Sequence, residues 1–374
     1  MILTADLGST FLKAALADDT GRMYGRAVRV RLEDSASPLC WINSLDKACL
    51  SLQEQYPAFD LSCIMLTGNG PTVVPVSSGI PTLSIMWDAG SNGASSPAFL
   101  PKIRYLRDAF PQEFAKASLF LGSAEYLCFH LTGKACASLP PAGFEKYYWN
   151  TEILESEGLE PAKFPPFMKP GTLLGNSRKF SCIKDGTPVL VPCPDYIPAI
   201  VGCGAVHDGI LCLRTGTGDG LNLCSSSDVF PEGLMVSGHP NGKDSNLSVI
   251  IPDTGAAIER ARMEAGLENT DFEQSLQEGP VRDACEKICL RTAQALKLYK
   301  DLSIKEIRIA HGLFDSPFLN SLRARYTGLP VYSTDCEETG LQGLAIMASS
   351  YLTGRDITLL ADENVELTPV LPAV

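Results

Sequence analysis

The chain has 374 residues, 45% of them hydrophobic and 20% charged, and a formal net charge of −12. Because one hydrophobic core rarely organises so long a chain, we expect two domains of comparable size. The negative charge argues against nucleic acid as a partner, and no apolar segment is long enough to cross a bilayer, which argues against a membrane.

The first part of the chain predicts an α/β domain. Three short β-prone runs at residues 2–9, 12–19 and 22–30 are separated by Gly and Asp turns, as in an antiparallel meander. Apolar residues at helical spacing then predict a helix over 43–56, and residues 62–68 indicate a buried strand that ends at a glycine.

A helical insertion is predicted beside this sheet. Pro101 and Pro111 suit the first turns of helices, and Gly133 suits a C-cap. The insertion is expected to contain three short helices, at residues 101–110, 111–122 and 123–133.

The second half of the chain continues the α/β pattern. Residues 188–204 predict a strand, a turn and a helix, and residues 210–224 predict a second hairpin around a glycine turn. Helices are predicted at 254–266, 281–299, 316–328 and 337–352, and strands at 304–310 and 329–333. We expect the boundary near residue 203, with domains at 1–203 and 204–374.

The thirteen cysteines, scattered from Cys40 to Cys336, have neither metal-ligand spacing nor the density of a disulfide framework. They are predicted to be reduced and mostly buried, with Cys285 and Cys289 on the core face of one helix. The four histidines also lack metal-ligand spacing. The first residues show no basic stretch before an apolar one, so we expect a cytoplasmic protein.

Two glycine turns carry the candidate chemistry. In DLGST, at residues 6–10, Asp6 ends a strand and can hold a hydrated cation, while Gly8 lets backbone amides approach a phosphate. By itself this segment is equally compatible with an ordinary hairpin turn. RTGTGDGLN, at 214–222, is a second such turn, and two of them could clamp the phosphates of a nucleotide from both sides.

The order of these segments resembles the carbohydrate kinases of the FGGY family, such as xylulokinase and glycerol kinase, from about residue 2 to residue 352. DLGSTFLKAAL and TGTGDG resemble the two phosphate motifs, and the segment from 101 to 134 resembles the family's helical segment with its YLxxxLTG stretch. AHGLFDSPFLNSLRARYTG resembles the adenosine motif. The resemblance implies a two-domain, actin-like ATPase (ribonuclease H-like) fold with an interdomain cleft.

The resemblance also implies ATP and Mg²⁺ as cofactors, with Asp6 serving the metal. The implied nucleotide-binding residues are Gly8, Ser9, Thr10, Lys13, Gly216, Thr217, Gly218, His311 and Gly312.

The family's general base is an Asp at the start of a helix shortly before the second phosphate hairpin, and Asp195 in PCPDYIPAIVGCG stands there. A carboxylate at this point can accept the proton of a substrate hydroxyl as it attacks the γ-phosphate. The alternative role for Asp195 is a plain helix N-cap.

Two further segments match the family's substrate-binding positions. Asn69 and Asp88 offer donors and acceptors for hydroxyls, and Trp87 offers a flat apolar face to a sugar. The alternative is structural, with Trp87 in the core and Asp88 as a helix cap.

Several departures from the family pattern bear on activity. Ala89 and Gly90 stand where the family commonly has an Arg, and Gly218 replaces a hydroxyl residue. Asp219 follows it, with a charge that would repel phosphates unless it is compensated. His311 lies where the family usually has glycine, and the segment before the helix near Val281 is short.

The leading hypothesis is ATP-dependent phosphorylation of a hydroxyl on a small sugar or polyol, in a monomer or a homodimer. The second hypothesis is a degenerate, non-catalytic kinase-like module that senses a sugar or a nucleotide. A third is an actin-like phosphatase or ATPase, in which water is the acceptor.

Overall fold

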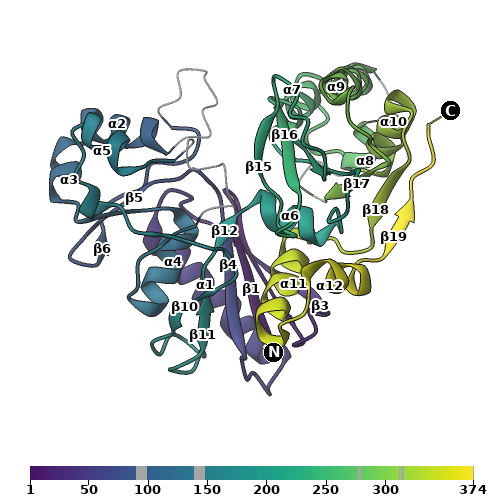
Figure 1. Ribbon diagram of the computed structural model, residues 1–374. Helices are drawn as coiled ribbons and strands as arrows, with labels where there is room; N and C mark the ends of the chain where they lie inside the picture. Colours follow the sequence, from purple (N-terminus) through teal and green to yellow (C-terminus); the bar gives the residue numbers. More distant parts are fainter. Residues whose placement is uncertain (90–98, 139–147, 277–278, 311, 313–315, 374) are drawn as a thin grey trace. The chain divides into compact units, whose positions relative to one another are not determined.

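The structure is a computed structural model that describes residues 1–89, 99–138, 148–276, 279–310, 312 and 316–373. The chain divides into two compact units (Figure 1). Unit 1 comprises Met1–Pro198 and Leu344–Asp356, and unit 2 comprises Ala199–Gly343 and Ile357–Val374. The chain therefore leaves unit 1 after residue 198 and returns to it at residues 344–356.

The main sheet of unit 1 begins with the predicted meander, formed by β1 (Ile2–Leu7), β2 (Phe11–Ala17) and β3 (Met23–Arg31). The order of the sheet is β10-β11-β4-β1-β2-β3, and β12 also pairs with β4. Strand β4 is parallel to β1, β11 and β12. The bounds are β4 (Cys63–Gly68), β10 (Leu173–Asn176), β11 (Pro188–Leu190) and β12 (Cys193–Pro194).

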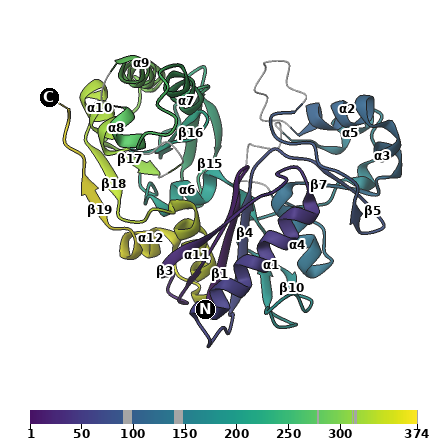
Figure 2. The same cartoon turned by 180° about the vertical axis from the view of Figure 1, so that it is seen from behind.

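Helix α1 (Pro38–Gln55) covers one face of this sheet, as Figure 2 shows. It buries Trp41, Leu45, Ala48 and Leu52, a spacing that gives a helix one apolar face. The Oγ of Ser37 caps its first turn by accepting a hydrogen bond from a backbone N–H. The helix therefore starts before residue 43, where apolar spacing alone had predicted it.

The helical insertion of unit 1 is a separate lobe with its own small sheet (Figure 1). The prediction of a helix over 111–122 is wrong in its second half, because residues 119–121 pair as a strand with residues 74–76. Pairing with a neighbouring strand here outweighs local helical propensity. The lobe contains β5 (Val74–Ser77), β6 (Ile80–Pro81), α2 (Leu100–Ala109), α3 (Pro111–Lys116), β7 (Leu119–Leu121) and α5 (Thr151–Ser156).

Several smaller elements complete unit 1. Helix α4 (Ser123–Thr132) ends at Gly133, which adopts the predicted left-handed C-cap conformation with φ of 74°. The other elements are β8 (Ala137–Ser138), a 3₁₀ turn at Pro161–Lys163, β9 (Phe167–Met168) and the first residues of α6 (Tyr196–Gly202).

The sheet of unit 2 has the order β15-β16-β14-β13-β17-β18-β19. The predicted hairpin is β13 and β14, and β17 and β18 run parallel to β13. An antiparallel meander followed by parallel strands thus occurs in both units. The bounds are β13 (Ile210–Arg214), β14 (Asp219–Ser225), β15 (Met235–Gly238), β16 (Ser245–Ile251), β17 (Glu306–Ala310), β18 (Val331–Thr334) and β19 (Leu367–Pro369).

The helices of unit 2 lie where the sequence predicts them, apart from two short additions, α8 and α12. Cys285 and Cys289 are buried on one face of α9, as predicted, and all thirteen cysteines are free thiols. The bounds are α7 (Gly255–Glu264), α8 (Phe272–Ser275), α9 (Gly279–Leu296), a 3₁₀ turn at Lys297–Tyr299, α10 (Pro317–Thr327), α11 (Thr339–Thr353), which ends in unit 1, and α12 (Ile357–Asn364).

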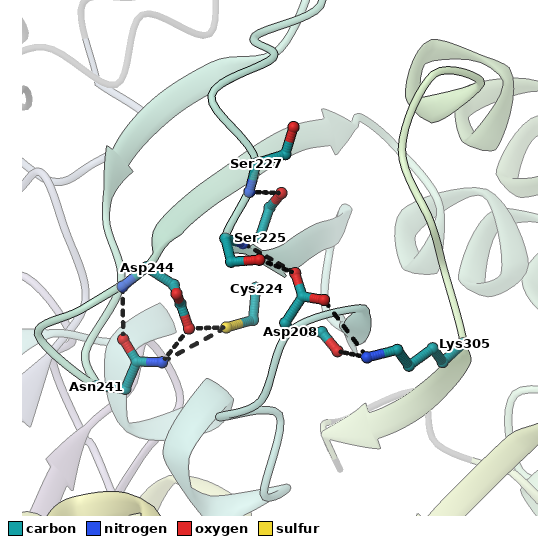
Figure 3. Close-up of polar contacts among 8 residues, drawn as sticks. Asp208, Cys224, Ser225, Ser227, Asn241, Asp244 and Lys305 are labelled. Atoms are coloured by element: carbon teal, nitrogen blue, oxygen red, sulfur yellow. Dashed lines mark hydrogen bonds and ion pairs between the residues drawn. The ribbon is translucent and has the colours of Figure 1, made fainter.

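A network of hydrogen bonds joins the loops at one end of the unit 2 sheet (Figure 3). The Nδ2 of Asn241 donates to Asp244 Oδ2 at 2.8 Å and to a backbone carbonyl at 3.0 Å. The Nζ of Lys305 donates to the backbone oxygen of Asp208 at 2.7 Å. These contacts join the loop before β13 to the loop before β17 and close the turn between β15 and β16. The network stabilises the sheet at the end away from the glycine turn.

In the described part of the chain, no helix is both long and apolar enough to cross a membrane.

Candidate active site

Three parallel strands of unit 1 end together and bring the predicted catalytic and metal residues to one edge of the sheet. In the register of these strands, Asp6 on β1 lies beside Thr67 on β4, and Thr67 lies beside Cys193 on β12. The Oγ1 of Thr67 donates to the Cys193 carbonyl at 2.6 Å, which fixes this register. Asn69 and Asp195 follow the ends of β4 and β12 directly.

The first glycine turn joins β1 to β2 at this edge. The backbone N–H of Gly8 donates to the carbonyl of Phe11 at 3.0 Å, and a Cβ on Gly8 would lie 3.0 Å from the same oxygen. The turn is therefore tight enough to favour glycine at this position. Ser9 and Thr10 are exposed, and Lys13 lies across from Asp6 on the neighbouring strand.

Asn69 connects the end of β4 to this turn. Its Nδ2 donates to the carbonyl of Gly8 at 3.2 Å, and its Oδ1 accepts from the hydroxyl of Thr72 at 2.7 Å. Its backbone N–H also donates to Leu7, at 2.8 Å. The side chain predicted to bind substrate therefore also positions the first glycine turn.

Asp195 is half-buried and stands between β12 and α6, as the sequence predicts. A second carboxylate lies in the same region, on Glu125 in the first turn of α4. Burial raises the pKa of Glu125, while hydrogen bonds from the N–H and hydroxyl of Ser138 oppose the shift. Burial also raises the pKa of Tyr148, and the negative charges of Glu125 and Asp195 add to that shift.

Trp87 and Asp88 lie in a turn that is tied to the Asn69 segment. The backbone groups of Val73 and Ile85 exchange two hydrogen bonds, of 2.9 and 2.7 Å. Trp87 is 36% exposed, so it is not a core residue, and Asp88 is exposed. The structural alternative for Trp87 is therefore wrong, and an exposed indole face is available beside Asp88.

The second glycine turn, Thr215 to Gly218, joins β13 to β14 in unit 2. Gly312 packs directly against it, because a Cβ on Gly312 would lie 2.0 Å from the carbonyl oxygen of Thr215. The turn also contacts the start of α7, where the N–H of Ala256 donates to the Thr217 carbonyl at 3.4 Å. Thr217 is exposed at the tip, and Gly216 is half-buried. His311 lies outside the described residues.

The charge of Asp219 is compensated within unit 2. Its carboxylate accepts a hydrogen bond from Arg323 Nη2 at 2.8 Å and another from the hydroxyl of Thr254 at 2.8 Å. Asp219 and Arg323 have side chains only 2% and 1% exposed. Asp219, which departs from the family pattern, therefore anchors the second glycine turn through a buried ion pair. Its negative charge is neutralised by Arg323 and does not repel a phosphate.

The predicted nucleotide and metal residues are compatible with a nucleotide and Mg²⁺. The described residues contain no group of three or more His, Cys, Asp or Glu side chains that could hold a metal ion by themselves. Mg²⁺ commonly takes one or two carboxylates and completes its shell with water and substrate phosphates. Asp6, at the strand end beside the first glycine turn, can supply such a single carboxylate.

Sequence reasoning did not single out Glu125, Tyr148 or Lys102, the last of which is a buried lysine in α2. Glu125 directly precedes the YLxxxLTG stretch and could have been noted there as an acidic residue in an apolar helix. Lys102 follows Pro101 in the first turn of a predicted helix, where the helix dipole disfavours a cation. A lysine at this position could therefore have been noted from the sequence.

Comparison with solved structures shows the fold of the chain. Xylulose kinase from Lactobacillus acidophilus matches with a TM-score of 0.82 and 16% identity, over 100% of this chain and 94% of that one. Gluconate kinase from the same organism has a TM-score of 0.81 and 15% identity, over 100% and 93% of the two chains. Glycerol kinase from Plasmodium falciparum, solved with ADP, has a TM-score of 0.77 and 14% identity, over 98% and 93%.

These matches confirm the expected α/β, two-domain, actin-like ATPase fold and the resemblance to carbohydrate kinases at the level of the fold. No family model and no curated protein matches the sequence.

Proposed function

We propose that this protein is a kinase that transfers the γ-phosphoryl group of ATP to a hydroxyl of a sugar or polyol. The observation that carries the proposal is the strand register in unit 1. It places Asp6, the glycine turn at Gly8 and Asp195 at neighbouring strand ends, in a chain with the fold of carbohydrate kinases. Phosphoryl transfer needs a base, a metal ligand and phosphate-binding groups, and we assign these three roles to Asp195, Asp6 and the first glycine turn.

In the proposed reaction, Asp195 accepts the proton of the attacking hydroxyl. Asp195 directly follows β12, and the hydrogen bond from Thr67 holds β12 beside β4. The strand register therefore sets the direction from which the carboxylate meets the acceptor. Burial, and then the charges of Glu125 and Asp195, raise the pKa of Tyr148, so this phenol stays protonated and can donate a hydrogen bond in the same region.

We assign phosphate binding to the two glycine turns, Gly8 to Thr10 in unit 1 and Gly216 to Gly218 in unit 2. Asp6 would hold a bound Mg²⁺, which would supply positive charge to the phosphates during transfer. Trp87 and Asp88 form the acceptor site, with the indole packed on the carbon edge of the sugar and the carboxylate accepting from its hydroxyls. Gly312 lies against the second turn, which supports its proposed place in the nucleotide site.

The ion pair between Asp219 and Arg323 supports an active enzyme over a degenerate sensor. An unpaired carboxylate in the second phosphate turn would be a reason for lost activity, whereas this carboxylate is buried and paired. Of the remaining departures, Ala89 and Gly90 concern the acceptor and His311 concerns the nucleotide. Gly218 and the short segment before the helix near Val281 still favour the sensor, and turnover decides between the two functions.

The test is an assay of ADP formation with ATP, Mg²⁺ and a panel of ketoses, aldoses, polyols and sugar acids. We expect ADP formation that depends on one acceptor class and a phosphorylated product of matching mass. The variant Asp195→Asn should lose at least ~100-fold in turnover while still binding ATP, because general bases contribute about that much. Asp185→Asn, at an exposed residue of the same unit, is the matched control.

Three results would contradict the proposal. ADP formation without any acceptor points to a hydrolase, and ATP or sugar binding without turnover points to a sensor. Turnover of Asp195→Asn within a few-fold of the wild type removes this residue from the mechanism.

A further inference from the structure

Lys102 occupies a position that is unfavourable for a cation. It lies in the first turn of α2 and is only 2% exposed. Burial lowers the pKa of its ammonium, and the negative charge of Asp88 opposes that shift. Desolvation of a charge is unfavourable unless partners compensate it.

Among the described residues, compensation for this charge is incomplete. No hydrogen bond or ion pair joins the Lys102 ammonium to another described residue, and only the charge of Asp88 opposes the effect of burial. Its neighbours on α2, Leu100 and Ile103, are buried in the apolar core of the lobe. Asp88 is the one described residue whose charge raises its pKa, and Asp88 is exposed.

The helix itself also opposes the charge. The first turn of a helix carries a partial positive charge from its free N–H groups, so cations are unfavourable there. Helix α2 has no acidic residue in its first turn, and Phe99 provides no side-chain cap. Burial and the helix dipole both disfavour the charge of Lys102, and no described residue pairs with it, a combination expected where function rather than stability fixes a residue.

The first turn of α2 is connected to the candidate acceptor site from two sides. On one side lies Asp88, in the turn that the Val73 and Ile85 hydrogen bonds tie to the end of β4. On the other side, the ring of Phe99 packs against Trp149 with centroids 5.1 Å apart. Trp149 follows Tyr148, whose phenol is within the electrostatic reach of Asp195.

We infer that Lys102 is a further acceptor-binding residue, whose ammonium donates hydrogen bonds to oxygen atoms of the molecule bound beside Trp87 and Asp88. The inference rests on the proposed function. The oxygen atoms could belong to hydroxyls of a neutral sugar or to the carboxylate of a sugar acid, and both would supply acceptor atoms that the described residues do not. A carboxylate would pair with the ammonium more strongly than a hydroxyl.

The experiment compares Lys102→Met with the wild type for one neutral acceptor and one sugar acid. Methionine keeps most of the side-chain volume and removes the charge. We expect the KM of the preferred acceptor to rise about tenfold or more, the usual effect of losing a hydrogen bond to a charged group, while the KM of ATP stays within about twofold. The thermal midpoint should be equal to or above that of the wild type, because an uncompensated buried charge is removed.

Two controls separate this role from a structural one. Lys116→Met removes an exposed lysine from α3 of the same lobe and should change neither KM nor thermal midpoint. Lys102→Arg keeps the charge and should retain part of the acceptor affinity. If Lys102→Met is folded and its acceptor KM equals that of the wild type for both acceptors, the inference is wrong. A fall in thermal midpoint without a change in KM shows a structural lysine instead.

The outcomes for the inference and for the proposed function are distinguishable. An active enzyme whose Lys102→Met variant phosphorylates the acceptor equally well contradicts only the role of Lys102. A wild type that binds a sugar by calorimetry without forming ADP contradicts the kinase function, and the role of Lys102 is then decided by the sugar affinity of the same variants. A wild type that neither binds nor phosphorylates any panel member contradicts both.

Discussion

The buried ion pair between Asp219 and Arg323 allows a quantitative prediction about unit 2. The substitution Arg323→Met removes the guanidinium and leaves an apolar side chain of similar length. Asp219 then keeps the hydroxyl of Thr254, at 2.8 Å, but loses its charged partner at 2.8 Å. The perturbation therefore leaves a carboxylate that is 2% exposed without a counter-charge.

The expected cost follows from the burial of both partners. Removing one member of a buried ion pair typically costs about 3 to 5 kcal/mol, since the remaining charge is desolvated and unpaired. The double variant Asp219→Asn, Arg323→Met removes both charges and keeps an amide beside Thr254. Because the Nε of Arg323 has no hydrogen-bond partner among the described residues, the pair is incompletely satisfied. We expect the double variant to be more stable than Arg323→Met alone.

The assay must report on unit 2 alone. All three tryptophans, Trp41, Trp87 and Trp149, belong to unit 1, so their fluorescence does not follow the unfolding of unit 2 directly. Cys285 and Cys289 are buried in α9, and their alkylation by a thiol reagent in increasing urea reports when this unit opens. Mass spectrometry of the two labelled peptides gives the midpoint for each variant.

Two results would refute the reasoning about this pair. One is a loss below about 1 kcal/mol in Arg323→Met, which would mean that water or a side-chain movement compensates Asp219. The other is a double variant whose loss equals the sum of the two single losses, which would mean that the two side chains act independently.

Two further predictions concern unit 2. Gly312→Ala should weaken ATP binding about tenfold by calorimetry, because its Cβ would lie 2.0 Å from the Thr215 carbonyl and displace the second glycine turn; an unchanged affinity would contradict the proposed place of this turn. His239 is 1% exposed, and burial lowers its pKa to about 4, below the ordinary value of 6.5. As pH falls from about 6.5 to 4, the unfolded chain binds a proton that the folded chain does not, so stability should fall by up to about 3 kcal/mol. His239→Asn should reduce this loss in urea titrations across that range, and the same slope in both proteins would show that other groups cause it.

The sequence was most informative where one local pattern determines a structure. The β meander, the hairpin at 210–224 and the helix over 281–299 follow from alternation or helical spacing, and they are present. Strands β15 and β16 were not predicted, because polar residues such as Asn246 and Ser248 lie inside them and hide the apolar pattern. These strands are stabilised by pairing with β14, which is a long-range contact.

The candidate site shows the same division between local and long-range information. Asp6 and Asp195 could be found because each stands at the end of a strand in a recognisable segment. Their common sheet edge depends on β4 lying between β1 and β12, which no local pattern encodes. The pairing of Asp219 with Arg323, more than a hundred residues later, was invisible for the same reason, and so the charge at 219 looked harmful to phosphate binding.

The return of residues 344–356 to unit 1 has a consequence for protein synthesis. Ser349 donates to the backbone of Asp19 at 2.9 Å, and Ile346 lies against Gly21, so this segment packs on the turn between β2 and β3. A ribosome releases Asp19 and Gly21 early, yet Ser349 follows Asp19 only 330 residues later in the sequence. Unit 1 must therefore wait in an unfinished state while unit 2 is made, and a nascent chain that stops before residue 344 should depend on chaperones or be degraded.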